Sequence, residues 1–340
     1  MKQNKRYFIV GAIVVLIAFL LGVYRLPYYV YQPGSADGLN DVVQVQDGFT
    51  SQGEMHLVTV RGGQATALQF ALAKIRPFHE VYELEQIRPK GVSKNEYYHA
   101  QLQMMESSQE AATVVAYKAA NKQIDINYDG VYVMSILEDV PAHNKLKIGD
   151  RITKVDDKEI HKSEDLLEYV KGMKVGRQLD ITFMRDGKSM TETVELVKHP
   201  KEDRAVIGIS LVTDREVEVD PSIDFSSGDI GGPSAGLMFS LEIYDQLTDK
   251  DITKGYQVAG TGEISYEGEI GRIGGIDKKV VAADDSGVDI FFAPNEGGKE
   301  GSNYEVAKKA AEEIGTDMKI VPVDTFQDAL DYLEKLEPKS

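Results

Sequence analysis

The sequence contains no cysteine among its 340 residues. This absence excludes a disulfide framework, a zinc site with cysteine ligands and a cysteine nucleophile. It does not identify the compartment, but it suits an exported protein that folds without thiols.

Basic residues are scarce relative to acidic ones. The chain has 38 lysines and arginines against 55 aspartates and glutamates, and its net charge is −17 at pH 7. Most of such a surface repels a phosphate backbone, whereas nucleic-acid binding needs a basic footprint. The composition therefore predicts no nucleic-acid partner.

Histidines are few as well. All six precede residue 203: His56, His79, His99, His143, His161 and His199. None belongs to an evident Ser/His/Asp arrangement, and the segment that begins at His79 lacks the second histidine of a zinc-protease helix. We therefore expect no metal and no cofactor, and a base other than histidine for any reaction in the C-terminal part.

A long uncharged stretch lies near the N-terminus. Residues 7–24 carry no charged side chain, and their length of 18 is close to the lower limit for a helix that crosses a bilayer. Basic residues precede the stretch, and tyrosines flank it as interfacial aromatics do: Lys2, Lys5, Arg6, Tyr7, Tyr24, Tyr28, Tyr29 and Tyr31. The pattern predicts a transmembrane helix in contact with the lipid bilayer.

The short basic end also predicts the orientation of this helix, because such ends stay in the cytoplasm. We expect residues 1–31 to form a cytoplasmic tip and a single-pass anchor in the cell membrane, with the rest of the chain extracytoplasmic. A cleaved signal peptide is the alternative, but residues 22–27 do not resemble a small-residue cleavage site.

Residues 32–124 form a mixed region. Alternating apolar residues at 41–45 and 56–60 predict two strands, the second ending at Gly62-Gly63, and a helix is expected over 65–75.

A longer helix is expected over 93–122. Ser93 can cap it, with Glu96 three residues later completing a capping box. The residues expected to face a core are Met104, Met105, Ala111, Val114 and Val115.

Two further domains are expected. Residues 125–199 read as a compact β-rich domain with strands at 130–136, 151–155, 179–185 and 190–196 and a helix at 163–171. A charged stretch with Pro200 makes a plausible boundary. Residues 203–340 alternate strands and helices, so the fold class is mixed α/β (α+β).

The segment Asp229–Gly236 carries the first candidate for chemistry. Gly231 and Gly232 permit a tight turn with exposed N–H groups, and Pro233 suits a helix start. Ser234 then precedes an apolar-periodic helix, whose N-terminus could stabilise an oxyanion on an attacked carbonyl. A helix cap without chemistry is the alternative.

A serine hydroxyl needs a base, and Lys279 is the candidate. Asp277 can cap a buried helix, which puts Lys279 in its first turn, while Lys278 is expected to be a surface charge. A helix N-terminus and desolvation both disfavour the ammonium form, so the neutral amine could take a proton from Ser234. An exposed helix lysine is the alternative.

Together these segments resemble the proteolytic domain of Lon proteases over about residues 203–340. The resemblance lies in Gly232–Gly236, Thr261–Ile264 and Gly268–Lys279, followed by strands and helices at 288–294, 304–314, 318–321 and 325–336. It implies a Ser–Lys dyad of Ser234 and Lys279, with Thr261 close to the lysine. Gly231 and Gly232 would support the turn.

The chain departs from the Lon pattern in two respects. Lon proteins usually have an acid directly before Gly-Pro-Ser, whereas the nearest acid here is Asp229, so a role for an acid is left open. No Gly-x-x-x-x-Gly-Lys-Ser/Thr phosphate loop is present. The resemblance therefore implies a serine endopeptidase that works without ATP on peptides, unfolded segments or membrane-tethered substrates.

The β-rich domain resembles a PDZ domain of bacterial proteases. The resemblance lies in Asp129–Val133, Val140–Ala142 and Leu146–Ile152. It implies that a peptide adds as a strand beside Gly130, Val131, Tyr132 and Val133, with its terminal carboxylate near Asp129-Gly130. A structural spacer with a closed groove is the alternative.

The order of anchor, PDZ domain and Lon-type domain resembles a family of membrane-bound Lon-like peptidases of Gram-positive bacteria. The resemblance implies peptides or small single-pass membrane proteins as substrates, and residues 32–124 packing on the protease domain. A membrane-tethered PDZ adaptor with an inert peptidase domain is one alternative. A tail-specific or HtrA-type PDZ protease is another, but the sequence lacks the Gly-Asn-Ser-Gly-Gly segment of the HtrA type.

Overall fold

The computed structural model describes residues 2–88 and 92–339 and divides the chain into two compact units. The first unit comprises residues 1–123 and 219–340, and the second comprises 124–218. The chain enters the second unit through β5 (Gln123–Ile136) and leaves it through β12 (Ile209–Asp220). Because β12 pairs with β5 in one sheet, the second unit extends beyond the predicted end at residue 199.

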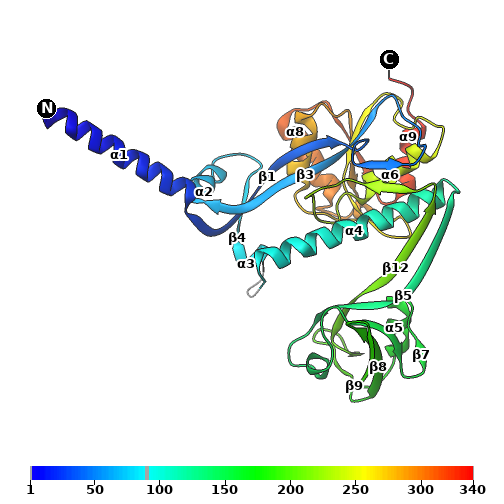
Figure 1. The fold of residues 1–340 in the computed structure, drawn as a ribbon. Coiled ribbons are helices and arrows are strands. Elements are labelled where there is room, and N and C mark those ends of the chain that lie inside the picture. The colour runs from blue at the N-terminus through cyan, green and yellow to red at the C-terminus, as the bar shows by residue number, and fades with distance from the viewer. Residues whose placement is uncertain (1, 89–91, 340) are drawn as a thin grey trace. The chain divides into compact units, whose positions relative to one another are not determined.

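A six-stranded mixed sheet organises the first unit. Its order is β18-β17-β14-β3-β1-β4. β1 pairs antiparallel with β3 and β4, and the remaining neighbours are parallel, so β1 and β3 lie side by side in Figure 1. The strands are β1 (Arg25–Gly38), β3 (Glu54–Thr66), β4 (Glu80–Glu83), β14 (Gln257–Gly260), β17 (Ile290–Pro294) and β18 (Lys319–Val323).

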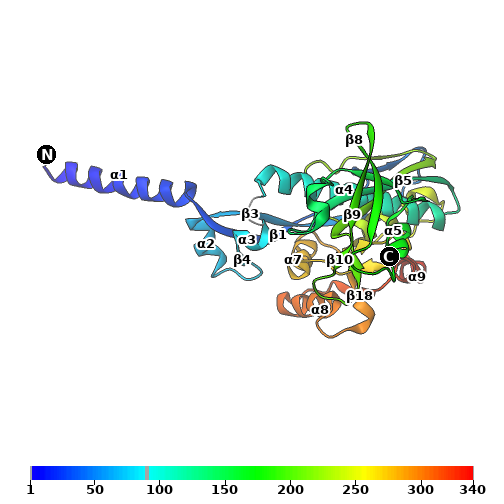
Figure 2. The same cartoon turned by 90° about the horizontal axis from the view of Figure 1, so that it is seen from below.

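Helices cover both faces of this sheet, as the alternation along β17 shows. Phe291 packs in the apolar cluster of α7 and α8, which lie together in Figure 2. The next residue, Phe292, points to the opposite face and contacts Tyr332 of α9 edge-on. The helices are α6 (Gly236–Leu247), α7 (Ile276–Asp285), α8 (Asn303–Ile314) and α9 (Phe326–Glu334). The predicted mixed α/β class is confirmed, and so are the strands and helices expected at the end of the chain.

The long helix α4 (Lys94–Ala119) confirms the element expected over 93–122. Ser93 and Glu96 form the predicted capping box, each accepting from the backbone N–H of the other. Four of the five residues expected in the core are buried: Met105, Ala111, Val114 and Val115. The prediction for Met104 is wrong, since this side chain is 46% exposed. One helical position rotates a side chain by about 100°, which is enough to leave the core.

The region before α4 differs from prediction in three ways. The first expected strand is reduced to β2 (Val43–Val45). The second does not end at Gly62-Gly63, because β3 continues through both glycines to Thr66, where α2 (Ala67–Ala73) begins. β1 was not expected, because its tyrosines resemble interfacial aromatics. In the fold, Tyr29 and Tyr31 belong to β1, which is paired with β3 and β4.

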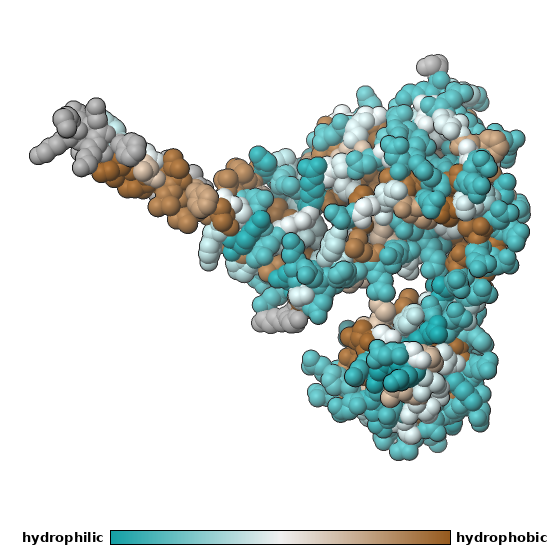
Figure 3. Space-filling view, in the orientation of Figure 1, coloured by the Kyte–Doolittle hydropathy of each residue, from teal (hydrophilic) through white to brown (hydrophobic). Residues whose placement is uncertain are grey.

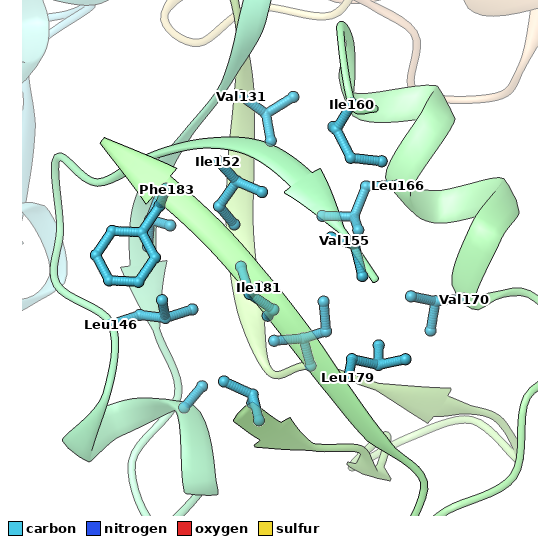
Figure 4. Packing of buried hydrophobic residues seen from close by; sticks show 14 of the residues in the cluster. Val131, Leu146, Ile152, Val155, Ile160, Leu166, Val170, Leu179, Ile181 and Phe183 are labelled. Atoms are coloured by element: carbon cyan, nitrogen blue, oxygen red, sulfur yellow. The ribbon is translucent and has the colours of Figure 1, made fainter. Parts of the chain in front are cut away.

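The second unit is a small sheet closed by one helix. Its strand order is β12-β5-β6-β8-β9, with β7 beside β6. The helix α5 (Ser163–Val170) directs Leu166 and Val170 into the core that Figure 4 shows, opposite Ile152 and Phe183. The bounds of the other elements are β6 (Arg151–Val155), β7 (Lys158–Glu159), β8 (Gln178–Arg185) and β9 (Lys188–Glu195). The predicted strands and helix of this domain are confirmed.

Several short elements complete the fold. They are α3 (Leu84–Ile87), β10 (Val197–Lys198), β11 (Ala205–Val206), β13 (Ile223–Phe225), β15 (Glu263–Ile264) and β16 (Ile270–Gly271), with 3₁₀ turns at Pro141–Asn144 and Glu296–Gly298.

The N-terminal helix α1 (Lys2–Val23) covers most of the segment 7–24 that we expected to cross a membrane. Its described apolar side chains are exposed, and Figure 3 shows them as a brown surface along the helix. Within residues 2–88 and 92–339, no helix combines the length and the apolar character that a membrane span requires.

Candidate active site

Ser234 lies in the turn that leads into α6, one residue before the N-cap Ala235. Its carbonyl oxygen accepts hydrogen bonds from the Gly262 N–H and the Thr261 hydroxyl, each at 2.9 Å. Thr261 and Gly262 directly follow β14, so the end of this central strand fixes the backbone of Ser234. The side chain of Ser234 is only half-buried, which leaves it accessible to a substrate.

The two glycines before Pro233 fit the turn against α4. A Cβ at Gly231 would lie 2.7 Å from Cβ of Gln101, and Gly232 has φ = 95°, a conformation that L-residues rarely adopt. The N–H of Gly232 donates to the Gln101 carbonyl at 2.8 Å. The expectation of an exposed N–H is therefore wrong for Gly232, because α4 takes this donor.

The side chain of Lys279 contacts the side chain of Ser234. Its Nζ lies 2.8 Å from Oγ of Ser234 and 2.8 Å from Oγ1 of Thr261. The backbone N–H of Lys279 is bonded to the Gly275 carbonyl, so the lysine belongs to the first turn of α7 as expected. The structure thus brings together Ser234, Lys279 and Thr261 from three separate segments.

Burial sets the charge of the Lys279 amine. The residue is 3% exposed, and desolvation lowers the pKa of Lys279 from 10.5 to about 7. No ion pair involves Lys279 in the described part of the chain, so no carboxylate compensates for the lost hydration. Near neutral pH a large fraction of this amine is unprotonated and can accept a proton.

Thr261 orients that amine. Its hydroxyl hydrogen is directed to the Ser234 carbonyl, so its oxygen can accept an N–H from Lys279. A neutral amine that donates to Thr261 has its lone pair free for the Ser234 hydroxyl. Thr261 is fully buried, which holds this arrangement in place.

Two expectations about the start of α7 are wrong. The N-cap is Gly275, with φ = 69°, and Asp277 lies in the first turn. Lys278 is not a surface charge, because it is fully buried and its Nζ pairs with Glu80 at 2.8 Å and with Asp277 at 3.0 Å. The partner Glu80 comes from β4, a strand distant in sequence, so local helix periodicity gave no sign of it.

The pairing with Lys278 affects the pKa of Glu80. Burial alone would raise its pKa, but hydrogen bonds from Lys278 and Tyr82 hold the pKa of Glu80 below its usual value. Two neighbouring lysines of α7 are thus buried in different ways, Lys278 between carboxylates and Lys279 between hydroxyls.

Two cavities reach the serine and the lysine. The larger, of about 670 Å³, is lined by five tyrosines: Tyr29, Tyr31, Tyr82, Tyr97 and Tyr98. The smaller, of about 300 Å³, is lined by Ser35, Asp37 and Thr59 of β1 and β3. Because Ser234 and Lys279 line both, an extended chain could occupy both cavities with one peptide bond at Ser234.

Two regions of the chain match known domain families. The PDZ domain matches residues 102–196, and the Lon protease (S16) C-terminal proteolytic domain matches residues 205–335. The chain carries a Lon-type serine-protease domain. A PDZ domain precedes it, and the resemblance of these two parts is confirmed.

Curated Lon proteases are similar to part of this chain. The Lon protease of Methanosarcina barkeri is 31% identical over 160 residues, which are 44% of this chain and 19% of the relative. That of Campylobacter jejuni is 36% identical over 102 residues, 30% of this chain and 12% of the relative. The chain thus spans about a tenth to a fifth of the length of the curated relatives it matches.

A solved PDZ domain is similar to part of this chain. The PDZ domain of an SdrC-like protein from Listeria monocytogenes is 36% identical and covers 26% of this chain and 93% of that chain, with a TM-score of 0.25.

Asp229, the acid nearest the Gly-Pro-Ser of the Lon-type domain, forms no ion pair with Lys279 among the described residues. Its Oδ1 accepts the Tyr98 hydroxyl at 2.8 Å. Asp229 lines both cavities beside Ser234, so it faces the space for substrate. No group of histidine, aspartate and glutamate side chains in the described residues could hold a metal ion.

The predicted peptide site of the PDZ domain is wrong. β5 lies between β12 and β6, so residues 130–133 offer no open strand edge. Val131 and Val133 are fully buried in the core, Tyr132 is half-buried, and the Gly130 N–H donates to the His161 carbonyl. Alternating valines mark a strand with one buried face, but they do not distinguish an inner strand from an edge strand.

The PDZ domain has a different groove, which sequence reasoning missed. A cavity of about 580 Å³ lies between α5 and residues 204–211, lined by Leu166, Val170, Ile207 and Leu211. β12 is at the end of the strand order, so it has an edge free of its own sheet. The signal in the sequence was Val206–Ile209, where a glycine interrupts three β-branched residues beside Arg204.

Proposed function

We propose that the protein is an endopeptidase in which Ser234 is the nucleophile and Lys279 is the general base and acid. The observation that carries the proposal is the 2.8 Å approach of the Lys279 amine to the Ser234 hydroxyl, with the amine buried and without an ion pair among the described residues. A serine with a base at this distance is the minimal requirement for nucleophilic acyl transfer.

The reaction follows from these positions. Oγ of Ser234 attacks the peptide carbonyl carbon while the neutral Lys279 amine takes the hydroxyl proton. The resulting ammonium gives its proton to the leaving amine as the C–N bond breaks, and an acyl-serine remains. Water then attacks the ester with Lys279 again as the base, which releases the acid and restores the free serine.

The polypeptide around Ser234 supplies the remaining support. Thr261 directs the lone pair of Lys279 toward Ser234, which favours proton transfer in one geometry. The N-terminus of α6 follows Ser234 by two residues, and its dipole favours negative charge on the attacked carbonyl oxygen.

Cleavage proceeds without ATP in this proposal. Each step uses only the side chains named above, and the sequence contains no phosphate-loop motif. The substrates are therefore peptides, unfolded segments or small single-pass membrane proteins that reach Ser234 without mechanical unfolding. Adding ATP with magnesium should leave the rate of peptide cleavage unchanged.

The PDZ domain presents such substrates. An extended peptide adds as a strand to the outer edge of β12, and its apolar side chains enter the groove beside α5. Replacing Leu167, which lines the same groove and is 58% exposed, by a charged residue should weaken peptide binding. A titration of labelled peptides against the full chain measures this effect.

Residues 7–24 attach the protein to a bilayer in this proposal, as a single-pass anchor with the two folded units outside the cytoplasm. The support is the absence of charged residues in this segment and the exposure of its described apolar side chains on α1. Flotation with vesicles and protection of the folded units from external protease in intact cells test the attachment and its orientation.

A comparison of proteomes tests the proposed activity directly. Secreted and membrane proteomes are compared between cells with the wild-type protein and cells with Ser234→Ala. A precursor should accumulate in the variant and shorten again when wild type is restored. Full biological function of Ser234→Ala, with no accumulating precursor, would instead support the adaptor with an inert peptidase domain.

A further inference from the structure

The two cavities beside Ser234 share one acidic side chain. Glu80, Glu263 and Asp229 line the larger cavity, and Asp37 and Asp229 line the smaller one. Asp229 alone belongs to both sets. Asp229 therefore lines both of the cavities that Ser234 lines.

The cations in the same walls are already compensated. Arg272 donates to both carboxylate oxygens of Glu296, and Lys278 pairs with Glu80 and Asp277. Among the residues that the structure describes, Lys279 is the remaining basic side chain in the walls, and burial favours its neutral form.

The acids that remain make the cavities negative. Asp37, Asp229 and Glu263 take part in no ion pair within the described residues. A cavity that holds unpaired carboxylates between low-dielectric walls attracts a cation more strongly than open solvent does.

Asp229 is exposed and accepts a hydrogen bond from Tyr98, so a cation in either cavity can reach its carboxylate. Tyr98 and Gln101 lie three residues apart on one face of α4, and they bind the Asp229 carboxylate and the Gly232 N–H. The Oδ1 oxygen of Asp229 accepts the Tyr98 hydroxyl, and the carboxylate has further lone pairs that can accept from a cation. The tyrosines of the larger cavity add aromatic faces, which also favour cations.

We propose that Asp229, held by Tyr98, is the specificity residue for a basic side chain of the substrate close to the scissile bond. This proposal rests on the proposed peptidase function of the same site. An arginine or lysine side chain enters the tyrosine-lined cavity, and its cationic nitrogen donates to Asp229. The role is in substrate binding, because among the described residues no hydrogen bond joins Asp229 to Lys279 or Ser234.

Peptides that differ only in charge test this assignment. The full chain is assayed with peptide pairs in which arginine or the isosteric, neutral citrulline occupies each position from four before to four after the cleaved bond. At one position we expect kcat/KM for arginine to exceed that for citrulline about tenfold, as a charge-assisted hydrogen bond allows. Equal values at every position overturn the proposal.

Variants then locate the preference. Asp229→Asn should reduce the arginine-to-citrulline ratio to below about twofold, and Tyr98→Phe should reduce it to about threefold, because the carboxylate stays but loses its support. Asp249→Asn, an exposed acid that lines neither cavity, is the matched control and should keep the full ratio. An undiminished ratio in a folded Asp229→Asn protein overturns the proposal.

A positive N-terminus is the other source of a cationic nitrogen. Peptides with acetylated and with free N-termini distinguish the two sources. A preference that comes from a basic side chain remains when the N-terminus is acetylated. A preference that disappears on acetylation overturns the side-chain assignment.

Binding separates failure of this proposal from failure of the proposed function. If the wild-type protein cleaves no peptide, fluorescence anisotropy with Ser234→Ala measures affinity for the same arginine and citrulline pairs. Tighter binding of arginine that is lost in Ser234→Ala/Asp229→Asn supports the role of Asp229 without activity. Equal affinity for both peptides overturns it.

Discussion

Lys278 and Lys279 are adjacent on α7, but their side chains enter two regions of the molecule that treat positive charge differently. The Lys278 region contains two carboxylates, Glu80 and Asp277, within 3.0 Å of the amine. The Lys279 region contains two hydroxyls, those of Ser234 and Thr261, at 2.8 Å. Both amines are buried, so the two regions differ in the partners of the amine and not in burial. In the proposed mechanism, the amine between hydroxyls is the one that serves as the base.

The largest effect is expected from removing either member of the Ser234–Lys279 pair. Ser234→Ala and Lys279→Met should each lower kcat/KM for peptide cleavage at least about 10³-fold, because nucleophile and base act as one unit. The double variant should be little worse than either single variant. Additive losses in the double variant would mean that the two residues act independently.

Lys279→Met should also stabilise the fold, unlike a change at Lys278. A buried amine with a pKa lowered from 10.5 to about 7 favours unfolding up to pH 7, and this cost decreases as the pH rises toward 10.5. A methionine avoids the cost, so we expect a gain of about 2 kcal/mol at pH 6. Denaturant unfolding at pH 6 and pH 9 measures it, and a loss of stability at pH 6 would contradict the account.

Lys278→Met should lower both the stability of the fold and the activity at pH 7. Glu80 and Asp277 would lose their cation, at a cost of about 1 kcal/mol because both carboxylates are partly exposed. The uncompensated negative charge beside α7 would favour the ammonium form of Lys279, so the pH–rate profile should move to higher pH and activity at pH 7 should fall about tenfold. Adding Glu80→Gln to Lys278→Met should move the profile back.

Thr261→Val should have a smaller effect that concerns orientation. The valine keeps the volume but removes both the acceptor for Lys279 and the donor to the Ser234 carbonyl. We expect kcat to fall about tenfold with KM within about twofold, since the amine stays in place but loses its preferred direction. A change in KM alone would indicate that Thr261 binds substrate instead.

The smallest effect concerns buried acids on α6. Burial raises the pKa of Glu242 from 4.5 to about 7 and that of Asp245 from 3.8 to about 6. The folded state therefore binds more protons than the unfolded state in this range, and stability falls as the pH rises through it. Glu242→Gln should flatten this pH dependence by about 1–2 kcal/mol between pH 5 and pH 8. Urea unfolding at both values tests it.

The sequence predicted what depends on contiguous motifs. Ser234 and Lys279 come from segments whose turn residues and helix starts can be recognised locally, and their separation in the chain did not matter because the resemblance to Lon proteases joined them. The capping box at Ser93 and Glu96 is likewise local. In each case the residues that define the feature lie within a few positions of one another.

The sequence could not predict what depends on strand order. The burial of Lys278 requires Glu80 from β4, and the free edge of the PDZ sheet belongs to β12 rather than β5. β1 was missed because Tyr29 and Tyr31 suit both an interface and a cavity wall. Periodicity shows that a strand has a buried face, but its neighbours are set by long-range pairing.

The pH dependence of kcat/KM for the wild-type protein tests the central claim most directly. With Lys279 as the base, activity should be low at pH 5, rise tenfold per pH unit, and level off above a midpoint near 7, where burial places the pKa of this amine. A profile that is flat from pH 5 to pH 9, or one whose midpoint lies near the ordinary lysine value of 10.5, would contradict the account.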